Sequence, residues 1–340
     1  MSLFSRLKRP EKANRSGEYR RQLAAPLLVL AVFVLLRLSG LIDARLTREN
    51  EYAAVILLQI LVFMLPASVY LALTRNTSGL RVRPFGVGHL LLILSAVLMI
   101  ESGSILLNCL TGGYETLSRS YDLWGIFVSK NSGGAAGAIY LILAYALLPA
   151  VCEEFVFRSI LCREYERRST LAAILMPSLF FAMLHFDIRR FPAFFLAGVI
   201  FSVTMYSSRS VLASAAVHLC CNLLSLFSRT YMRTLWDLGG EKFFFFIVTA
   251  VFLLFGFLLF AEAARLYRNY SAGGYSDSYR EMLPPPVTPS EIEGGRADFS
   301  LQFAAAHPRI AATVSALLSP TALVCYIFFA AVLLLSAGQG

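Results

Sequence analysis

Charged residues are scarce in this sequence. Only 15% of its 340 residues are charged, whereas 57% are hydrophobic, and the mean hydropathy is +0.66. Soluble domains average about 45–50% apolar and about 25% charged residues. A soluble core could not bury this much apolar surface, so we exclude a soluble globular domain and expect an all-α fold, a polytopic transmembrane helix bundle.

Several familiar motifs are also absent. The six cysteines include no C-x-x-C pair, and most fall in apolar runs, where a thiol packs as a small apolar group. The sequence has no glycine-rich phosphate loop, no G-x-S-x-G nucleophile elbow and no H-E-x-x-H zinc motif. These absences argue against a dithiol redox protein, a nucleotide-binding domain and a hydrolase with a serine elbow.

Long apolar runs are what the sequence does contain. A helix needs about 20 apolar residues to cross about 30 Å of hydrocarbon. We therefore predict about eight or nine spans on this length criterion, at residues 23–42, 53–74, 87–110, 136–162, 170–187, 191–207, 210–229, 243–266 and 310–337. Pro320 would kink the last span.

Composition divides the chain into six parts. They are a basic N-terminus (1–22), N-terminal spans (23–134), a membrane core (135–229), an additional span (230–267), a linker rich in proline and glycine (268–309) and a C-terminal span (310–340). The linker composition cannot form a packed core. We therefore expect a chain that ends after Arg268 to keep its activity.

The net charge of +9 is explained by membrane topology. Basic residues gather at the N-terminus and in short loops, and the positive-inside rule then places the N-terminus in the cytoplasm. We expect a multi-pass protein that is embedded in the lipid bilayer of a bacterial cell membrane. Nothing in this distribution indicates nucleic-acid binding.

Three ionisable residues interrupt the predicted span 136–162. Glu154 and Arg158 are four residues apart and share a helix face, so they can form an ion pair. Glu153 points about 100° away from Glu154 and keeps its carboxylate free. We therefore predict a structural role for the Glu154–Arg158 pair and a catalytic role for Glu153. The alternative is that all three residues only hold neighbouring helices together.

Two later spans carry further polar groups. His185 lies as far from a predicted turn near Ser169 as Glu153 does, so an antiparallel hairpin would bring them to one height. His218 and Asn222 share one face of their helix because they are four residues apart. Depths estimated from the helical rise allow all four side chains to meet about half-way into the bilayer.

At these residues the sequence resembles the CAAX-protease and bacteriocin-processing family of intramembrane peptidases, which includes the Rce1-like prenyl proteases. Three family motifs occur in order: E-E-x-x-x-R at Glu153, Glu154 and Arg158, F-x-x-x-H at Phe181 and His185, and H-x-x-x-N at His218 and Asn222. The resemblance covers residues 136–229 and includes Gly198, Tyr206 and Ser214. Ser202 stands where many members have a second glycine, and we expect only a packing effect.

The resemblance implies an endopeptidase whose site residues are Glu153, Glu154, Arg158, His185, His218 and Asn222. Two mechanisms fit these residues. In one, Glu153 and His185 activate water, and His218 and Asn222 donate to the oxyanion. In the other, Glu153, His185 and His218 bind Zn²⁺ or another divalent metal that activates the water. The residue chemistry slightly favours the metal-free mechanism.

Two other functional classes stay open at this point. Buried Glu and His side chains also serve proton-coupled transporters, which would spread them along a pathway and break spans in matched halves. A non-catalytic membrane scaffold is the third reading. For a peptidase, the partner is a peptide or membrane-protein substrate, and prenylated C-terminal peptides, bacteriocin leaders and membrane-protein segments are all candidates.

Overall fold

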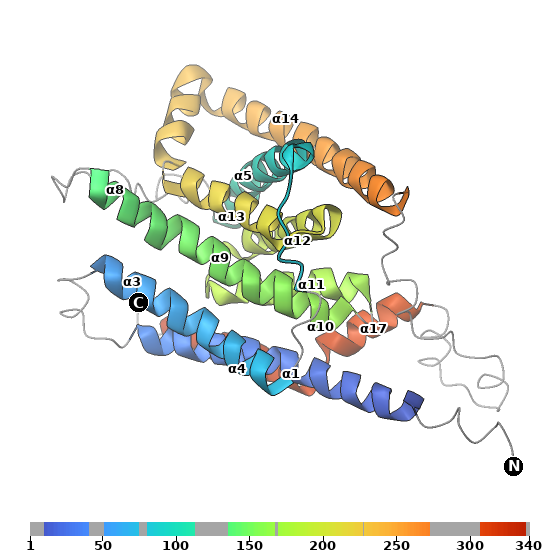
Figure 1. The fold of residues 1–340 in the computed structure, drawn as a ribbon. Coiled ribbons are helices and arrows are strands. Elements are labelled where there is room, and N and C mark those ends of the chain that lie inside the picture. The colour runs from blue at the N-terminus through green and yellow to red at the C-terminus, as the bar shows by residue number, and fades with distance from the viewer. Residues whose placement is uncertain are drawn as a thin grey trace, which may run out of the picture.

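The computed structural model describes residues 10–40, 51–74, 80–112, 135–166, 169–226, 228–272 and 307–337. Within these ranges the chain is helical and contains no strand. The helices form a bundle with the segment α8–α10 in its centre (Figure 1). Helices α5 and α14 pack against each other and lie to one side of this segment, and α1, α3 and α4 lie on the other.

The first helices precede the membrane core. Helix α1 is Pro10–Ser39, and α5 is Leu90–Gly112, after a short 3₁₀ turn η3, Val87–His89. Between them α3 (Glu51–Gln59) and α4 (Leu65–Thr74) are joined by the π-helical turn η2, Ile60–Met64. This wide turn contains the residue four positions before Pro66, where the proline ring would crowd an α-helical carbonyl.

A long, nearly continuous helical segment runs through the centre. It consists of α8 (Ala135–Ile142), η4 (Leu143–Leu147), α9 (Leu148–Glu154), η5 (Phe155–Leu161) and α10 (Cys162–Glu166). The π-helical turn η4 again contains the residue four positions before a proline, Pro149. The turn η5 contains no proline and follows Glu154 directly, in line with the frequent occurrence of π turns at functional sites.

Three shorter helices pack around this segment. Helix α11, Thr170–Leu184, begins at Ser169, whose hydroxyl accepts from the Ala172 backbone N–H at 3.4 Å. Helix α12 is Phe191–Ser208, and α13 is Val211–Leu226. Between these two helices Arg209 adopts a left-handed φ of 56°, which makes a tight turn.

A segment without regular secondary structure, residues 80–86, joins the ends of several of these helices. Arg81 forms a bidentate ion pair with Glu166, at 2.6 and 2.7 Å, and its carbonyl accepts from the Val211 backbone N–H at 3.0 Å. The Ser159 hydroxyl donates to the Leu80 carbonyl at 2.5 Å. The segment therefore connects α10, η5 and the start of α13.

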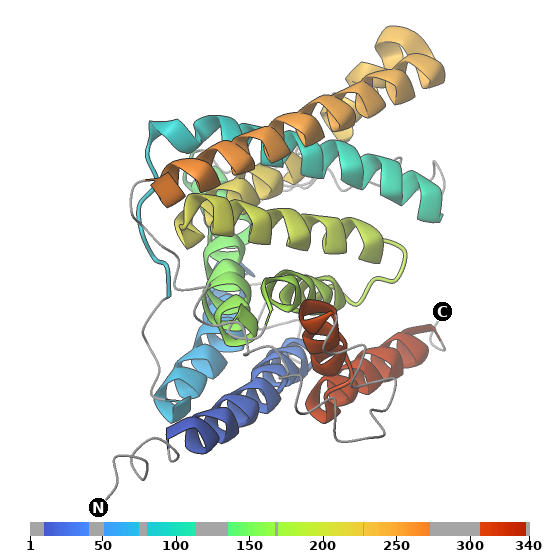
Figure 2. The same ribbon diagram turned by 90° about the vertical axis from the view of Figure 1, so that its right-hand side faces the viewer.

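The C-terminal half adds two elements beyond the core. Helix α14, Ser228–Ala272, packs along α5 and is broken at Gly240, where φ is 71° and ψ is −169°. Helices α17 (Pro308–Leu317) and α18 (Pro320–Ala337) meet at 51° and pack against α11 and α1 (Figure 2). Of the predicted linker 268–309, only the helical ends are among the described residues.

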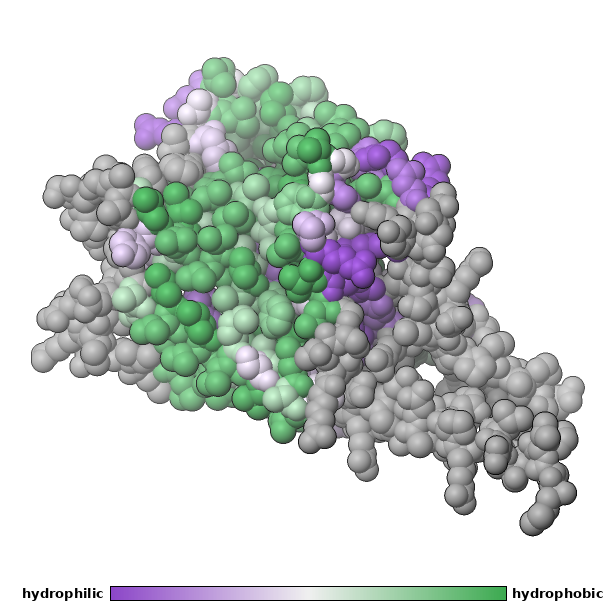
Figure 3. All heavy atoms as spheres, in the orientation of Figure 1, coloured by the Kyte–Doolittle hydropathy of each residue, from purple (hydrophilic) through white to green (hydrophobic). Residues whose placement is uncertain are grey.

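By length and composition, five helices in the described ranges could cross a membrane: Ala53–Thr74, Val87–Gly112, Ala138–Glu166, Phe191–Ser208 and Tyr231–Asn269. The bent pair α17 and α18 would make a sixth, and α1, α11 and α13 contribute shorter apolar helices. The predicted count of eight or nine spans is thus not confirmed. Apolar residues dominate the face shown in Figure 3, and hydrophilic residues gather mainly on one side. Because several helices are long and apolar enough to cross a bilayer, the protein is an integral membrane protein.

Candidate active site

Glu154, the last residue of α9, accepts hydrogen bonds from three side chains. Arg158 Nη1 donates to Oε1 at 2.7 Å, and Ser214 donates to Oε2 at 2.5 Å. His218 Nδ1 donates to Oε1 at 3.1 Å. The Glu154 side chain is fully buried, and a buried carboxylate is stable only when such partners compensate its lost hydration. The predicted Glu154–Arg158 pair is therefore present, with Ser214 and His218 added to it.

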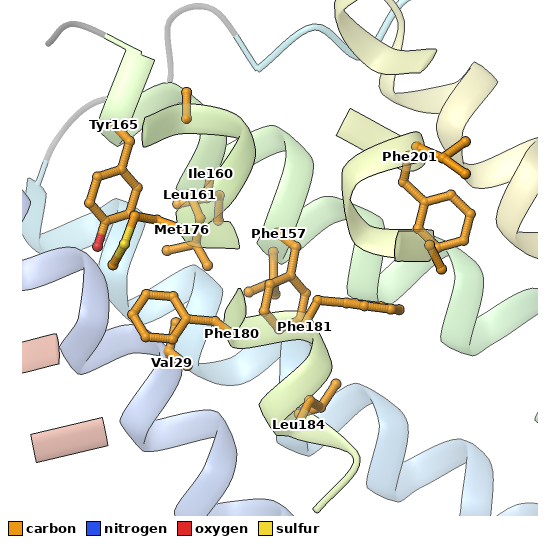
Figure 4. Close-up of a cluster of buried hydrophobic side chains, with 14 of the residues drawn as sticks. Val29, Phe157, Ile160, Leu161, Tyr165, Met176, Phe180, Phe181, Leu184 and Phe201 are labelled. Carbon is orange, nitrogen blue, oxygen red and sulfur yellow. The ribbon is translucent and has the colours of Figure 1, made fainter. Parts of the chain in front are cut away.

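Arg158 is enclosed by aromatic rings. Its guanidinium carbon lies 4.6 Å from the Phe181 ring centroid and 4.9 Å from that of Phe201. A third ring, Phe157, is 5.9 Å away, and these three phenylalanines lie in the buried cluster of Figure 4. Cation–π contacts of this kind stabilise a desolvated cation by about 2 kcal/mol or more. The rings thus help to hold a positive charge inside the apolar bundle.

The second contact of Arg158 depends on Gly198. Arg158 Nη2 donates to the Gly198 carbonyl at 3.2 Å. A Cβ at position 198 would lie 2.8 Å from Ser178 Cα and 2.9 Å from Ser178 Cβ. Only glycine therefore allows α12 to approach α11 this closely. Ser202, one turn further on, donates to the same carbonyl at 3.0 Å.

Glu153 has very different surroundings from its neighbour. It is 8% exposed, and its Oε2 is buried with no hydrogen-bond partner in the part of the chain that the structure describes. Buried polar atoms nearly always have partners, so an unpartnered carboxylate oxygen requires an explanation. His218 is close enough for its charge to interact with Glu153. The geometry therefore leaves one buried Glu153 oxygen without a hydrogen-bond partner among the described residues, in contrast to Glu154.

His218 is oriented by its contact with Glu154. Since a carboxylate accepts, Nδ1 carries the proton, and in the neutral ring Nε2 is the acceptor. The imidazole stacks on Phe201 with 4.7 Å between centroids, and Phe181 meets it edge-on at 5.7 Å. Both the tautomer and the direction of the His218 ring are thus fixed by neighbouring groups.

His185 lies at the C-terminal end of α11 and is exposed. Its Nδ1 donates to the Phe181 carbonyl at 2.9 Å, so Nε2 is again the acceptor in the neutral ring. The imidazole stacks on Phe194 at 3.6 Å, and Phe181 meets it edge-on at 5.1 Å. Phe181 therefore contacts both histidines, and the charges of His185 and His218 are close enough to interact.

Asn222 is on the same face of α13 as His218, one turn further along. Its Nδ2 donates to the Ala146 carbonyl in the π turn η4 at 3.2 Å. The structure thus brings Glu153, Glu154, Arg158 and His218 together, joins His185 to them through Phe181, and uses Asn222 to connect α13 with η4.

The proposed metal ligands do not form a metal-binding group in this arrangement. Throughout the described ranges, no three His, Cys, Asp or Glu side chains are grouped closely enough to hold a metal ion. The set Glu153, His185 and His218 therefore does not fit a resident Zn²⁺ in this arrangement.

Sequence reasoning missed the role of some residues. Ser214 was noted only as part of a family-like stretch, and its hydrogen bond to Glu154 joins residues 60 positions apart. Glu101 lies in the middle of the span Val87–Gly112 and accepts from the Tyr231 hydroxyl at 3.0 Å, a contact for which the sequence predicted no role. The interruption of an apolar run by one acid was the available signal for Glu101.

Together, the helical fold and the buried carboxylate–histidine cluster define an integral membrane protein with an enzyme-like polar site. Residues 135–224 match the family model described as Type II CAAX prenyl endopeptidase Rce1-like. This segment runs from α8 into α13 and contains all six predicted site residues. No curated protein and no solved structure matches the chain.

Proposed function

We propose that this protein is an intramembrane endopeptidase in which Glu153 is the general base. The observation that carries this proposal is the contrast between two adjacent carboxylates. Glu154 accepts hydrogen bonds from three side chains, whereas Glu153 has a buried oxygen without a partner in the described structure. Such a carboxylate is suited to take a proton from water.

The proposed reaction is direct hydrolysis. Glu153 removes a proton from a water molecule, and the water oxygen attacks the carbonyl carbon of the scissile peptide bond. The proton then passes to the leaving amine as the C–N bond breaks, so Glu153 returns to its starting state. His185 shares in activating the water, because its Nε2 is an acceptor in the neutral ring.

The remaining residues support this chemistry. The developing oxyanion accepts from the second N–H of the Asn222 amide and from Nε2–H of His218 in its imidazolium form, which carries protons on both ring nitrogens. Glu154 fixes the orientation of His218 through Nδ1, and Arg158 balances the charge of Glu154. The Arg158–Glu154 pair is therefore structural in this scheme, and it acts on the reaction through His218.

We further propose that the substrate is a peptide or a membrane-protein segment that reaches the site within the bilayer. The description of the matching family model names a CAAX prenyl endopeptidase, so prenylated C-terminal peptides are the first class to test. Bacteriocin leaders and membrane-protein segments are the next.

Glu153→Gln tests the proposal, because the amide keeps the shape of the side chain and removes the base. A peptide library incubated with purified protein in detergent or liposomes supplies the assay. We expect turnover to fall by about two orders of magnitude or more, as for loss of a general base. Glu101→Gln is the matched control, because it removes a span carboxylate outside the site. Wild-type turnover by Glu153→Gln would overturn the proposal.

A further inference from the structure

The residue that follows His185 has an unusual backbone conformation. Phe186 has a left-handed φ of 48°, which bulky L-amino acids rarely adopt. Its backbone N–H still donates to the Met183 carbonyl at 3.1 Å. The chain therefore turns sharply where α11 ends, and contacts elsewhere must hold this turn.

Those contacts come from two helices outside the segment that matches the family model. The Phe186 ring lies 5.5 Å from the ring of Phe33 on α1. It also lies 6.3 Å from Phe328 and 5.8 Å from Phe329, both on α18. The guanidinium of Arg37 is placed over the Phe186 ring at 5.6 Å. The Phe186 side chain is thus held between α1 and the C-terminal helix.

The same C-terminal helices also contact the other end of α11. The hydroxyl of its N-cap, Ser169, donates to the Arg309 carbonyl at 3.3 Å and lies 3.5 Å from the Thr313 hydroxyl, both on α17. The Cys325 thiol on α18 donates to the Pro26 carbonyl on α1 at 3.2 Å. Helices α17 and α18 therefore extend along α11 from its first turn to its last and are fastened to α1.

We propose that Phe186 is a positioning residue and that α1 and the α17–α18 pair orient His185 through it. This inference rests on the proposed peptidase function. His185 is exposed, and its described contacts are the Phe181 carbonyl and two aromatic rings. Its direction consequently depends on the backbone at 185 and 186, which the ring of Phe186 anchors.

This proposal opposes the expectation that a chain ending after Arg268 keeps its activity. Loss of α17 and α18 would remove Phe328 and Phe329 from Phe186, and Arg309 and Thr313 from Ser169. The C-terminal helices then belong to the catalytic structure, although no catalytic group lies on them.

Kinetics of full-length variants test whether Phe186 positions His185. Phe329→Ala should lower kcat by about 10- to 100-fold with little change in KM, since a misplacement of about 1 Å can cost about 100-fold. Ile327→Ala, at a neighbouring position that is 69% exposed, should leave kcat unchanged. Phe186→Tyr should keep most of the activity, whereas Phe186→Ala should lose it as Phe329→Ala does.

Phe186→Gly separates the ring from the turn. Glycine relieves the left-handed backbone but removes the contacts with α1 and α18. If the ring positions His185, this variant loses kcat like Phe186→Ala. Wild-type kcat in Phe186→Gly would overturn the proposal.

Hydrogen exchange gives a readout that does not depend on activity. Amide exchange at His185 and Phe186 should be at least about tenfold faster in Phe329→Ala than in wild type or Ile327→Ala, because the turn would open more often. Unchanged exchange would refute the positioning role of Phe186 even if no substrate has been found. If Glu153→Gln is inactive while Phe329→Ala has wild-type kcat and exchange, only the positioning role fails; if Glu153→Gln is fully active, the peptidase proposal fails.

Discussion

Arg158 shows what single residues contribute to this site. Its guanidinium donates from one nitrogen to Glu154 and from another to the Gly198 carbonyl, between three aromatic faces. A lysine ammonium is a compact point charge and cannot reproduce this planar, two-nitrogen contact. The position therefore requires arginine, and not only a positive charge.

Replacing Arg158 should first affect folding. Arg158→Ala leaves Glu154 as a buried charge without its cation, which typically costs about 3–5 kcal/mol. We expect a clear drop in the folded yield and in the thermal unfolding midpoint of purified protein, with Arg158→Lys in between.

Arg163→Ala is the matched control for this prediction. It breaks another buried ion pair, 3.1 Å long, whose partner is the adjacent Glu164 and which lies in α10. It should lower stability without changing the kcat of the folded fraction. A well-folded Arg158→Ala that has no activity would instead mean that Arg158 contacts the substrate.

At the scale of helices, apolar run length predicted where the helices lie better than which helices cross the membrane. Each of the nine predicted spans overlaps a helix of the described structure, but only five of these helices, or six if the bent pair is one span, are long and apolar enough to cross a bilayer. The π turns were not predicted. Two of them precede prolines that the sequence does show, but a proline produces a kink, a break or a wide turn depending on its neighbours.

The site was predictable only in part, for a related reason. Spacing by four predicted the Glu154–Arg158 pair, because both residues are on one helix. The contacts of Glu154 with Ser214 and His218 cross from α9 to α13. Such contacts depend on how helices are rotated against one another, and periodicity within one helix does not specify that rotation.

The break in α14 supports a prediction at this scale. Gly240 has φ 71° and ψ −169°, a region that is essentially accessible only to glycine, and nothing lies within 4 Å of a Cβ built there. Gly240→Ala should therefore cost about 1–3 kcal/mol through backbone strain alone. Thermal unfolding should show the loss, whereas kcat should be unchanged, because α14 carries no site residue.

Gly256→Ala serves as the control in the same helix. A Cβ there meets only Met99, at ordinary contact distances of 3.6 and 3.7 Å, and alanine is the better helix former. Its stability should match or exceed that of wild type. Equal effects of the two substitutions would contradict the backbone explanation.

For the whole molecule, the sharpest remaining choice is between metal-free and metal-assisted hydrolysis. The proposed metal-free reaction predicts that purified protein contains no stoichiometric zinc and that chelators leave turnover unchanged. His218→Gln should then keep a fraction of the activity, since its amide can still donate and loss of one oxyanion donor costs about 10²–10³ in rate. Elemental analysis of wild type beside the His185 and His218 variants provides the measurement.

One result would overturn the proposed metal-free reaction. If one equivalent of metal co-purifies, is lost from both histidine variants together with activity, and restores turnover after chelation, the enzyme is metal-dependent. The site would then have to rearrange on binding, because the described residues do not group as ligands.

The close approach at Gly198 has a consequence for how much sequence change the core can accept. Positions 198 and 202 are one helical turn apart on α12, and the Ser202 hydroxyl donates to the Gly198 carbonyl. Yet a methyl group at 198 would overlap Ser178 and push away the carbonyl that binds Arg158. In a saturation library selected for folded protein, we expect small residues to be recovered freely at 202 and only glycine at 198. Recovery of alanine at 198 at a frequency similar to that at 202 would show that the two helices can separate without loss of the buried charge pair.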